Sequence, residues 1–334
     1  MKKVVVDMFG ADLGAEPIVR GSFEALKQHP ELTAVFVGDG DLVKSTASDF
    51  KVDPSQYSVI ETDQYITNND SPTCVFSGKE NSSMVLALEH LKADPDCIGI
   101  ISAGNTGALM VGSIFKLGLY PGLKQPALST ALPRYDGGLV CLVDCGASMD
   151  CKPKDLARFA LMGNAFMKSM CDTYSPRIGL LSVGRESKKG NELTLAAYSM
   201  LTELPVNFIG NIEGNDIFTG YADVVVTDGF AGNVILKNAE ATGKSAIAVL
   251  DDLLGEEVKS SPALSSLKQK LWALYDFNSQ GGATFLGTKK IVVKMHGCAT
   301  ESTANACIEQ ILRLEGKGFN KFMAEAFPDT KANG

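Results

Sequence analysis

The feature that most constrains the fold is an alternation of short Val- and Ile-rich runs with longer segments of helical periodicity. The runs end in Gly, Asp or Asn, and Pro after a polar or acidic residue predicts helix starts at residues 17, 72 and 153. We predict strands at residues 3–7, 34–38, 98–102, 139–144, 178–183, 207–210, 224–227 and 291–294. This order predicts the α/β class, with a doubly wound, Rossmann-like sheet covered by helices.

No repeat, low-complexity tract or long linker divides the chain, so we expect a single domain over residues 1–334. Residues 245–275 carry two apolar stripes separated by a break at 255–262, which predicts two helices joined as a protruding hairpin. For the stripes by themselves, a dimer seam or ordinary core is the favoured interpretation.

Composition excludes several classes of function. A net charge of -8 argues against nucleic-acid binding, which needs clustered Lys and Arg. The eight cysteines have no CxxC spacing, so neither a zinc site nor a disulfide framework is indicated. The apolar start is too short for a signal peptide, and polar residues interrupt the apolar segment 98–120. We therefore expect a cytoplasmic protein.

Four loops that follow predicted strands are rich in Gly and amides: FGADLG, AGNTGALM, GRESKKGNEL and DGFAGNVILK. Their backbone N–H groups can approach an anion, and a following helix N-terminus adds partial positive charge. In the third loop Arg185, Lys188 and Lys189 stand beside Gly190 and Asn191 at a helix start, which favours phosphate binding. Turn chemistry and a solvated charged loop remain open as alternatives.

A series of motifs then resembles one family. SAGNTGALM (102–110), DCGASMDCKP (144–153), KGNELT (189–194), NFIGNIEG (207–214) and ADVVVTDGFAGNVILK (222–237) resemble the PlsX family of phosphate acyltransferases. The resemblance implies a three-layer αβα fold like that of the isocitrate and isopropylmalate dehydrogenases, a homodimer, and no metal or organic cofactor. It also implies Lys189 and Asn233 as the catalytic pair.

The first loop departs from the family's usual MGGDHGP. Phe9 replaces a Gly and Leu13 replaces a His, whereas the acidic residue is kept as Asp12. A catalytic His in this loop is therefore excluded. Further departures fall at Ser148 and at residues 296–303.

The implied reaction transfers a fatty acyl group from acyl carrier protein to inorganic phosphate, an early step of phospholipid synthesis. Phosphate is already a nucleophile, so the enzyme has to bind it, aim it and stabilise charge on the carbonyl oxygen. We expect Lys189, Asn191 and the Gly190 amide to hold phosphate, and Asn105, Thr106 and Asn233 to orient it or donate to the oxyanion. The remaining predicted substrate-binding residues are Asp12, Gly107, Arg185 and Gly232. His296 is expected to lie outside direct substrate contact.

The resemblance also suggests peripheral membrane contact through the hairpin tip, around Leu254, Val258 and Leu264, with Lys259 and Lys268 facing anionic lipid. The expected partners are acyl carrier protein, a second copy of the chain, membrane lipid and a downstream glycerol-3-phosphate acyltransferase. An acidic carrier protein needs a local basic patch on this acidic chain, for which Lys124, Arg134, Lys152 and Lys154 are candidates.

Three alternatives remain. The first is a phosphotransacetylase-like enzyme that uses acyl-coenzyme A. The second is a nicotinamide-dependent decarboxylating dehydrogenase, which the sequence disfavours because no cluster of Asp metal ligands is evident. The third is a non-catalytic membrane scaffold, which the intact glycine and amide loops disfavour.

Overall fold

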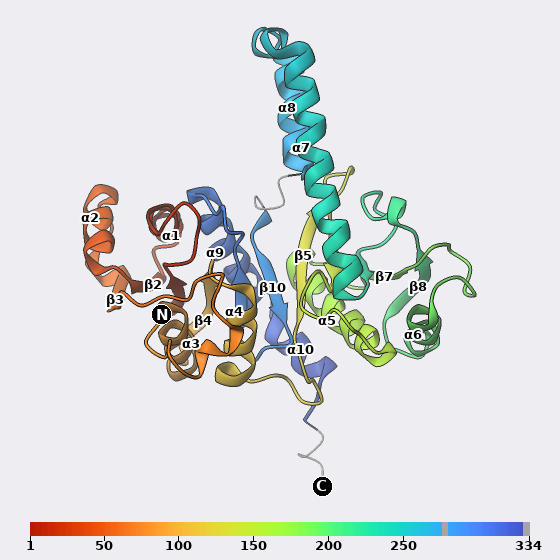
Figure 1. Ribbon diagram of the computed structural model, residues 1–334, viewed down its shortest axis with the longest axis horizontal. Coiled ribbons are helices and arrows are strands. Elements are labelled where there is room, and N and C mark those ends of the chain that lie inside the picture. The colour runs from red at the N-terminus through yellow and green to blue at the C-terminus, as the bar shows by residue number, and fades with distance from the viewer. Residues whose placement is uncertain (276–279, 330–334) are drawn as a thin grey trace. The chain divides into compact units, whose positions relative to one another are not determined.

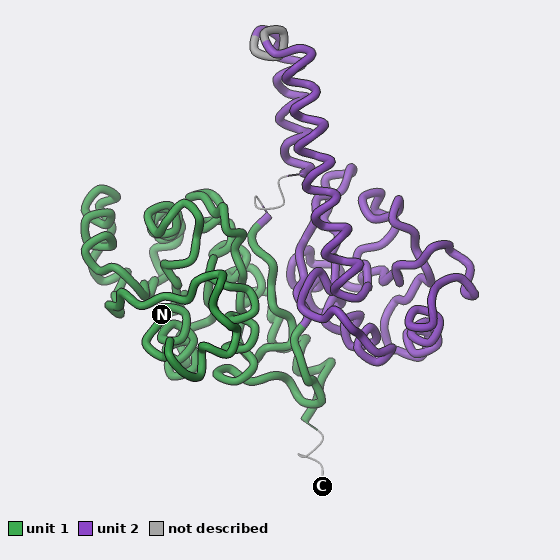
Figure 2. The backbone as a smooth tube through the Cα atoms, in the orientation of Figure 1, with its two compact units in different colours: residues 1–126, 281–334 green, residues 127–280 purple. Residues whose placement is uncertain are grey.

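The computed structural model describes residues 1–275 and 280–329, without the side chains of residues 256–259. The chain forms two compact units (Figure 2). Unit 1 contains residues 1–126 and 281–334, and unit 2 contains residues 127–280. The single domain expected over residues 1–334 stays a prediction.

Unit 1 contributes six strands in the order β3-β2-β1-β4-β11-β10 (Figure 1). They are β1 (Lys2–Asp7), β2 (Leu32–Gly38), β3 (Tyr57–Glu61), β4 (Cys97–Ser102), β10 (Ala283–Leu286) and β11 (Ile291–Lys294). The five neighbouring strands β3, β2, β1, β4 and β11 are parallel to one another, and β10 pairs antiparallel with β11. Every residue of β2 and β4 is buried, as expected of parallel strands covered on both faces.

Six α-helices accompany these strands: α1 (Glu16–Gln28), α2 (Gly40–Phe50), α3 (Ser83–Ala93), α4 (Thr106–Gly112), α9 (Glu301–Gly316) and α10 (Phe319–Ala326). Short turns of helix lie at Pro54–Gln56, Pro72–Val75 and Ser113–Leu117. The expected helix start at Pro17 is confirmed, whereas Pro72 opens only a short 3-10 helix. At α1 and α9 the backbones approach closely, because a Cβ on Gly21 would lie 2.1 Å from the Glu301 carbonyl oxygen.

Unit 2 contributes five strands in the order β5-β6-β9-β7-β8. They are β5 (Ala127–Pro133), β6 (Leu139–Val143), β7 (Arg177–Leu181), β8 (Asn207–Ile212) and β9 (Val224–Val226). The strands β6, β9, β7 and β8 are parallel, and β5 pairs antiparallel with β6. The helices are α5 (Pro153–Cys171), α6 (Glu192–Thr202), α7 (Gly229–Ser260) and α8 (Pro262–Tyr275), with a 3-10 turn at Gly214–Asp216.

The eight predicted strands are all present within two residues of their predicted bounds, which confirms the α/β class. The sequence reading missed β3, β5 and β10. The strand β5 was missed because Ser129 and Thr130 interrupt its apolar pattern, although both side chains are buried.

The helices α7 and α8 lie side by side and extend away from the strands of unit 2 (Figure 1). The expected break at 255–262 is wrong in its extent, because α7 is continuous to Ser260 and Gly255 lies inside it. One internal Gly costs a helix only about 1 kcal/mol relative to Ala, which packing between two helices can offset. Gly243 permits this packing, since a Cβ there would lie 2.2 Å from the Tyr275 ring.

Among the described residues, no helix is both long enough and apolar enough to span a membrane.

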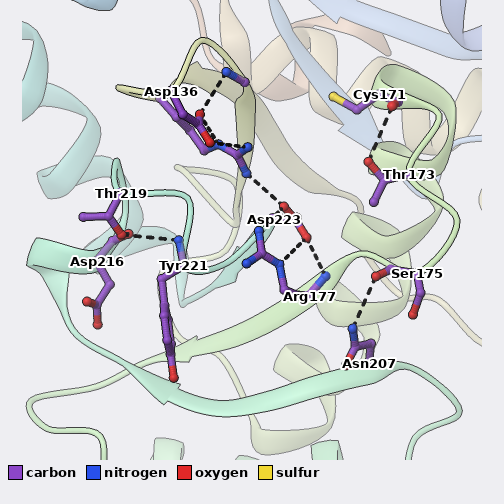
Figure 3. A network of polar contacts seen from close by, with 12 residues as sticks. Asp136, Cys171, Thr173, Ser175, Arg177, Asn207, Asp216, Thr219, Tyr221 and Asp223 are labelled. Carbon is purple, nitrogen blue, oxygen red and sulfur yellow. Dashed lines mark hydrogen bonds and ion pairs between the residues drawn. The ribbon is translucent and has the colours of Figure 1, made fainter.

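Asp223 organises an ionic cluster in unit 2, where it directly precedes β9 (Figure 3). Its carboxylate accepts hydrogen bonds from Nη1 of Arg134 at 2.9 Å and from Nε and Nη2 of Arg177 at 3.0 and 2.9 Å. The expectation that Arg134 belongs to a basic docking patch is therefore wrong. This guanidinium is mostly buried and is shared between Asp223 and Asp136.

Replacing Asp223 with Asn should destabilise the protein by about 2–3 kcal/mol, because two guanidinium groups would lose a partly buried counter-charge. Burial disfavours the charged form, but the hydrogen bonds and charges of Arg177 and Arg134 outweigh it and lower the pKa of Asp223. A lowered folded-state pKa stabilises the protein above the unfolded value of about 3.9, and this contribution disappears as the pH falls through the folded value. Urea unfolding at several pH values should therefore show the two proteins converging below about pH 4. A stability difference that stays constant down to pH 2 would contradict this account.

Candidate functional site

The carboxyl ends of β6, β9, β7 and β8 lie at one edge of unit 2, because these neighbouring strands are parallel. Ligands of open α/β sheets bind beyond such an edge. The segments that leave it are residues 144–152, 182–191, 213–216 and 227–233, the last of which includes the first turn of α7. Lys189 and Asn233 follow the adjacent strands β7 and β9, so both members of the expected catalytic pair belong to this edge.

Asp144 holds the loop after β6 in place. Its Oδ1 accepts the backbone amides of Leu128, Gly146 and Ala147, each at 3.0 Å. Its Oδ2 accepts the amide of Ser148 at 2.7 Å. Burial raises the pKa of Asp144, and the four amides oppose that rise by favouring the carboxylate. The carboxylate is fully buried and is thus a structural anchor of the loop.

The first turn of α7 packs directly on this loop. A Cβ on Gly232 would lie 1.9 Å from the Asp144 carbonyl oxygen, and a Cβ on Gly229 would lie 2.7 Å from that of Ser148. The Gly232 amide donates to the carbonyl of Asp228, the residue that precedes α7. The structure thus gives Gly232 a close-packing role, while Nδ2 of Asn233 donates to the Cys145 carbonyl at 3.3 Å. This bond uses one of the two amide hydrogens of Asn233.

The loop that carries Lys189 is fastened by its backbone. Nδ2 of Asn211, a buried residue of β8, donates to the carbonyls of Glu186 at 2.8 Å and Lys189 at 3.3 Å. Oγ of Ser182 also donates to the Lys189 carbonyl, at 3.1 Å. Gly190 has a φ of +130°, in the region that favours glycine, and allows the chain to turn into α6. The base of Lys189 is therefore fixed.

The Lys189 side chain is exposed, and no hydrogen bond or ion pair to its ammonium group occurs within the described part of the chain. Lys188, its neighbour, is exposed in the same way. Asn191 is the N-cap of α6, and its Oδ1 accepts the Thr194 amide at 2.9 Å. The Asn191 side chain, which was expected to bind phosphate, thus already caps a helix, whereas the ammonium groups of Lys188 and Lys189 are both available.

Arg185 is engaged elsewhere. Its guanidinium pairs with the buried Asp216 through Nε at 3.2 Å and through Nη2, and lies over the Tyr221 ring, 4.7 Å from its centroid. Arg185 was expected to bind phosphate, but its guanidinium is already paired with Asp216. The sequence did not reveal this ion pair, because 31 residues separate the two side chains.

The predicted residues of unit 1 lie after β1 and β4. The Asn105 side chain caps α4 by accepting the Ala108 amide at 3.0 Å, and its Nδ2 reaches the carbonyl of Thr67 at 3.2 Å. Gly107 packs against Pro72, because a Cβ there would lie 2.8 Å from the ring. Thr106, the first residue of α4, and Asp12 are exposed. These two keep side chains that can face solvent or substrate.

Sequence reasoning missed two buried carboxylates, Asp7 and Asp144. Asp7 accepts hydrogen bonds from Oγ of Ser83 at 2.5 Å and of Ser102 at 2.6 Å. Burial raises its pKa to about 6, although both serines oppose the rise. Each carboxylate ends a Val-rich strand, in the runs VVVD and LVCLVD, and a charged residue directly after a buried strand is the signal that identifies them.

A pocket of about 550 Å³ in unit 1 is lined by Phe9, Tyr65 and four carboxylates, those of Asp39, Asp41, Glu61 and Asp63. Its negative charge disfavours inorganic phosphate. His296 lies after β11, with Nδ1 3.1 Å from Sγ of Cys298, and the Asp12 amide donates to the next carbonyl, that of Gly297.

The α/β fold resembles that of solved phosphotransacetylases. A phosphotransacetylase from Streptococcus pyogenes matches with a TM-score of 0.64 and 15% identity over 94% of each chain. The EutD phosphotransacetylase from Staphylococcus aureus matches with a TM-score of 0.62 and 14% identity over 94% of each chain. At these identities the likeness concerns the fold alone.

Sequence relatives define the family. Residues 2–322 match the family model described as "Fatty acid synthesis protein". A Phosphate acyltransferase from Clostridioides difficile (strain 630) is 33% identical over 99% of each chain, and one from Bacillus cereus (strain B4264) is 35% identical over 94% of this chain and 95% of its own. The chain belongs to the PlsX family of phosphate acyltransferases, as its motifs indicated. It is an acyltransferase with a role in phospholipid synthesis.

Proposed function

We propose that the enzyme transfers a fatty acyl group from acyl carrier protein to inorganic phosphate and releases acyl phosphate. The observation that carries this proposal is Lys189, an uncommitted cation on a loop fastened by Asn211 and Ser182, at the same sheet edge as Asn233. A fixed backbone with a free ammonium group suits a small anion.

In the proposed reaction a phosphate oxygen attacks the thioester carbonyl and forms a new C–O bond. The C–S bond then breaks, and the carrier thiolate leaves and takes a proton from water. Lys189 neutralises the phosphate, and the second amide hydrogen of Asn233 is available to the carbonyl oxygen as negative charge develops there. The nucleophile comes from the substrate, so no Ser or Cys of the chain has to form a covalent intermediate.

The predicted residues of unit 1 are proposed to have two different roles. Asp12 and Thr106 are proposed to contact substrate, because their side chains are exposed. Asn105 and Gly107 are proposed to shape the loop after β4, since both already pack against the segment 67–72.

The competing function is transfer from acyl-coenzyme A, which the phosphotransacetylase fold favours. The experiment is a comparison of palmitoyl carrier protein with palmitoyl-coenzyme A, each with and without phosphate, with acyl phosphate trapped by hydroxylamine. We expect phosphate-dependent product with the carrier protein at a kcat/KM at least tenfold higher than with coenzyme A. A preference for coenzyme A would select the competing function, and no product from either would support the non-catalytic scaffold.

We further propose the three-layer arrangement of the isocitrate and isopropylmalate dehydrogenases, a homodimer, and a cytoplasmic enzyme that meets membrane lipid through the α7–α8 hairpin. A downstream glycerol-3-phosphate acyltransferase would consume the product. Leu254 and Leu264 are half-buried, Val258 lies outside the described side chains, and Leu253 is 73% exposed. Flotation of the Leu253→Asp variant with anionic vesicles is the test, and undiminished binding would exclude this surface.

A further inference from the structure

A group of three potential metal ligands lies in unit 1, where α3 ends and β4 begins. His90 and Asp94 stand four residues apart at the end of α3, and Cys97 is the first residue of β4. One imidazole nitrogen, one carboxylate oxygen and the Sγ atom lie within 4.8 Å of one another. This is the amino end of β4, whereas the loop after β4 that carries Asn105 leaves the carboxyl end. The group is thus separate from the candidate site.

One nitrogen atom of this group is buried without a hydrogen-bond partner. Nε2 of His90 is buried and has no hydrogen-bond partner, and its distance to Oδ2 of Asp94 is 3.9 Å, too long for a hydrogen bond. Cys97 is fully buried and carries a free thiol. A buried polar nitrogen without a partner is costly, and a bound cation removes that cost.

We propose that His90, Asp94 and Cys97 form a zinc site that is independent of acyl transfer. The combination of imidazole, thiolate and carboxylate suits Zn²⁺, which prefers four ligands in a tetrahedron, with water as the fourth here. Bonds of about 2.0–2.3 Å place tetrahedral ligand atoms about 3.5 Å apart. The three ligand atoms, which lie within 4.8 Å of one another, therefore have to move closer together by about 1 Å when zinc binds. On binding, the Cys97 thiol gives its proton to solvent, and the thiolate and the Asp94 carboxylate balance the two positive charges of the metal.

Lys3 competes with the metal for the same carboxylate. Its Nζ lies 2.7 Å from Oδ2 of Asp94, and the Oδ1 atom accepts the Asp96 amide at 2.9 Å. The Lys3 side chain is 31% exposed, so it can turn outward toward Asp96 when zinc takes the inner oxygen. Lys290 is committed to the Cys97 carbonyl oxygen at 2.6 Å. The Lys3–Asp94 ion pair is therefore the barrier to zinc, and removing it should tighten binding.

The test is titration of the metal-free full-length protein with Co²⁺, a spectroscopic substitute for zinc, followed by displacement with Zn²⁺. We expect one equivalent of cobalt to give a thiolate-to-metal charge-transfer band that zinc abolishes. The band should vanish in Cys97→Ala and in His90→Gln, and Lys3→Met should lower the dissociation constant at least tenfold. Cys141→Ala removes a buried thiol outside the group and should leave the band unchanged.

Zinc should also raise the thermal midpoint of the parent by a few degrees and leave that of Cys97→Ala unchanged, because the metal ties the end of α3 to the start of β4. Acyl transfer should be equal with and without zinc, so the metal readouts remain valid whether or not the proposed reaction is correct. The proposal is overturned if the band persists in Cys97→Ala. It is equally overturned if the band instead follows the exposed Cys298, or if neither the parent nor Lys3→Met binds cobalt.

Discussion

Asp144→Ala should lose most of the stability of unit 2, the largest effect that we expect from any single substitution. The change leaves the amides of Leu128 and residues 146–148 without their acceptor in a buried setting. Each unsatisfied buried donor costs about 1–3 kcal/mol, so four of them cost several kcal/mol, comparable with a typical net stability of about 5–15 kcal/mol. Circular dichroism during urea unfolding should show a large shift of the midpoint or no folded baseline.

The matched control is Asp144→Asn. This residue keeps an oxygen for the three amides on Oδ1 and loses only the bond from Ser148, where its own NH₂ would face another donor. We expect a loss of about 1–3 kcal/mol from that single conflict. Equal stabilities for the Ala and Asn variants would refute the idea that Asp144 acts as the acceptor for this loop. The buried negative charge would then explain the effect.

Lys189→Ala should lower kcat/KM for phosphate by about 100-fold or more, equivalent to about 3 kcal/mol of transition-state stabilisation, while the protein stays folded. The Lys189 side chain is exposed and makes no ion pair with any described residue, so its removal should not change the free energy of unfolding. Steady-state kinetics with phosphate as the varied substrate measure the loss. Unfolding midpoints within about 0.5 kcal/mol of the parent would separate a catalytic defect from a structural one.

Lys188→Ala is the control for this experiment, because the adjacent lysine shares the loop, the charge and the exposure. The backbone of Lys189 is held by Asn211 and Ser182, whereas no side chain of the described residues fixes that of Lys188. We expect the Lys188 variant to retain activity within about threefold, since a solvated surface charge contributes little. Similar losses in both variants would indicate a diffuse electrostatic effect and remove Lys189 from the proposed mechanism.

Local patterns could be read from the sequence because their physical causes are local. Val4–Val6 and Val224–Val226 alternate with helical segments, and this spacing determined the strands, the α/β class and the sheet edge at which glycine-rich loops emerge. The family likewise follows from the series of motifs alone, because each motif is a contiguous run of residues. The helix start at Pro153 follows from the fixed φ of proline.

Only the tertiary structure decided which charged residues are available for chemistry. Arg134 and Arg185 read as cations near the site, yet Asp223 and Asp216, distant in the chain, engage them. The roles of Asp144 and of the group formed by His90, Asp94 and Cys97 likewise depend on contacts that folding creates. A residue's type and its near neighbours determine what it can do, but the partners that satisfy or free its charge come from segments that composition and spacing do not connect.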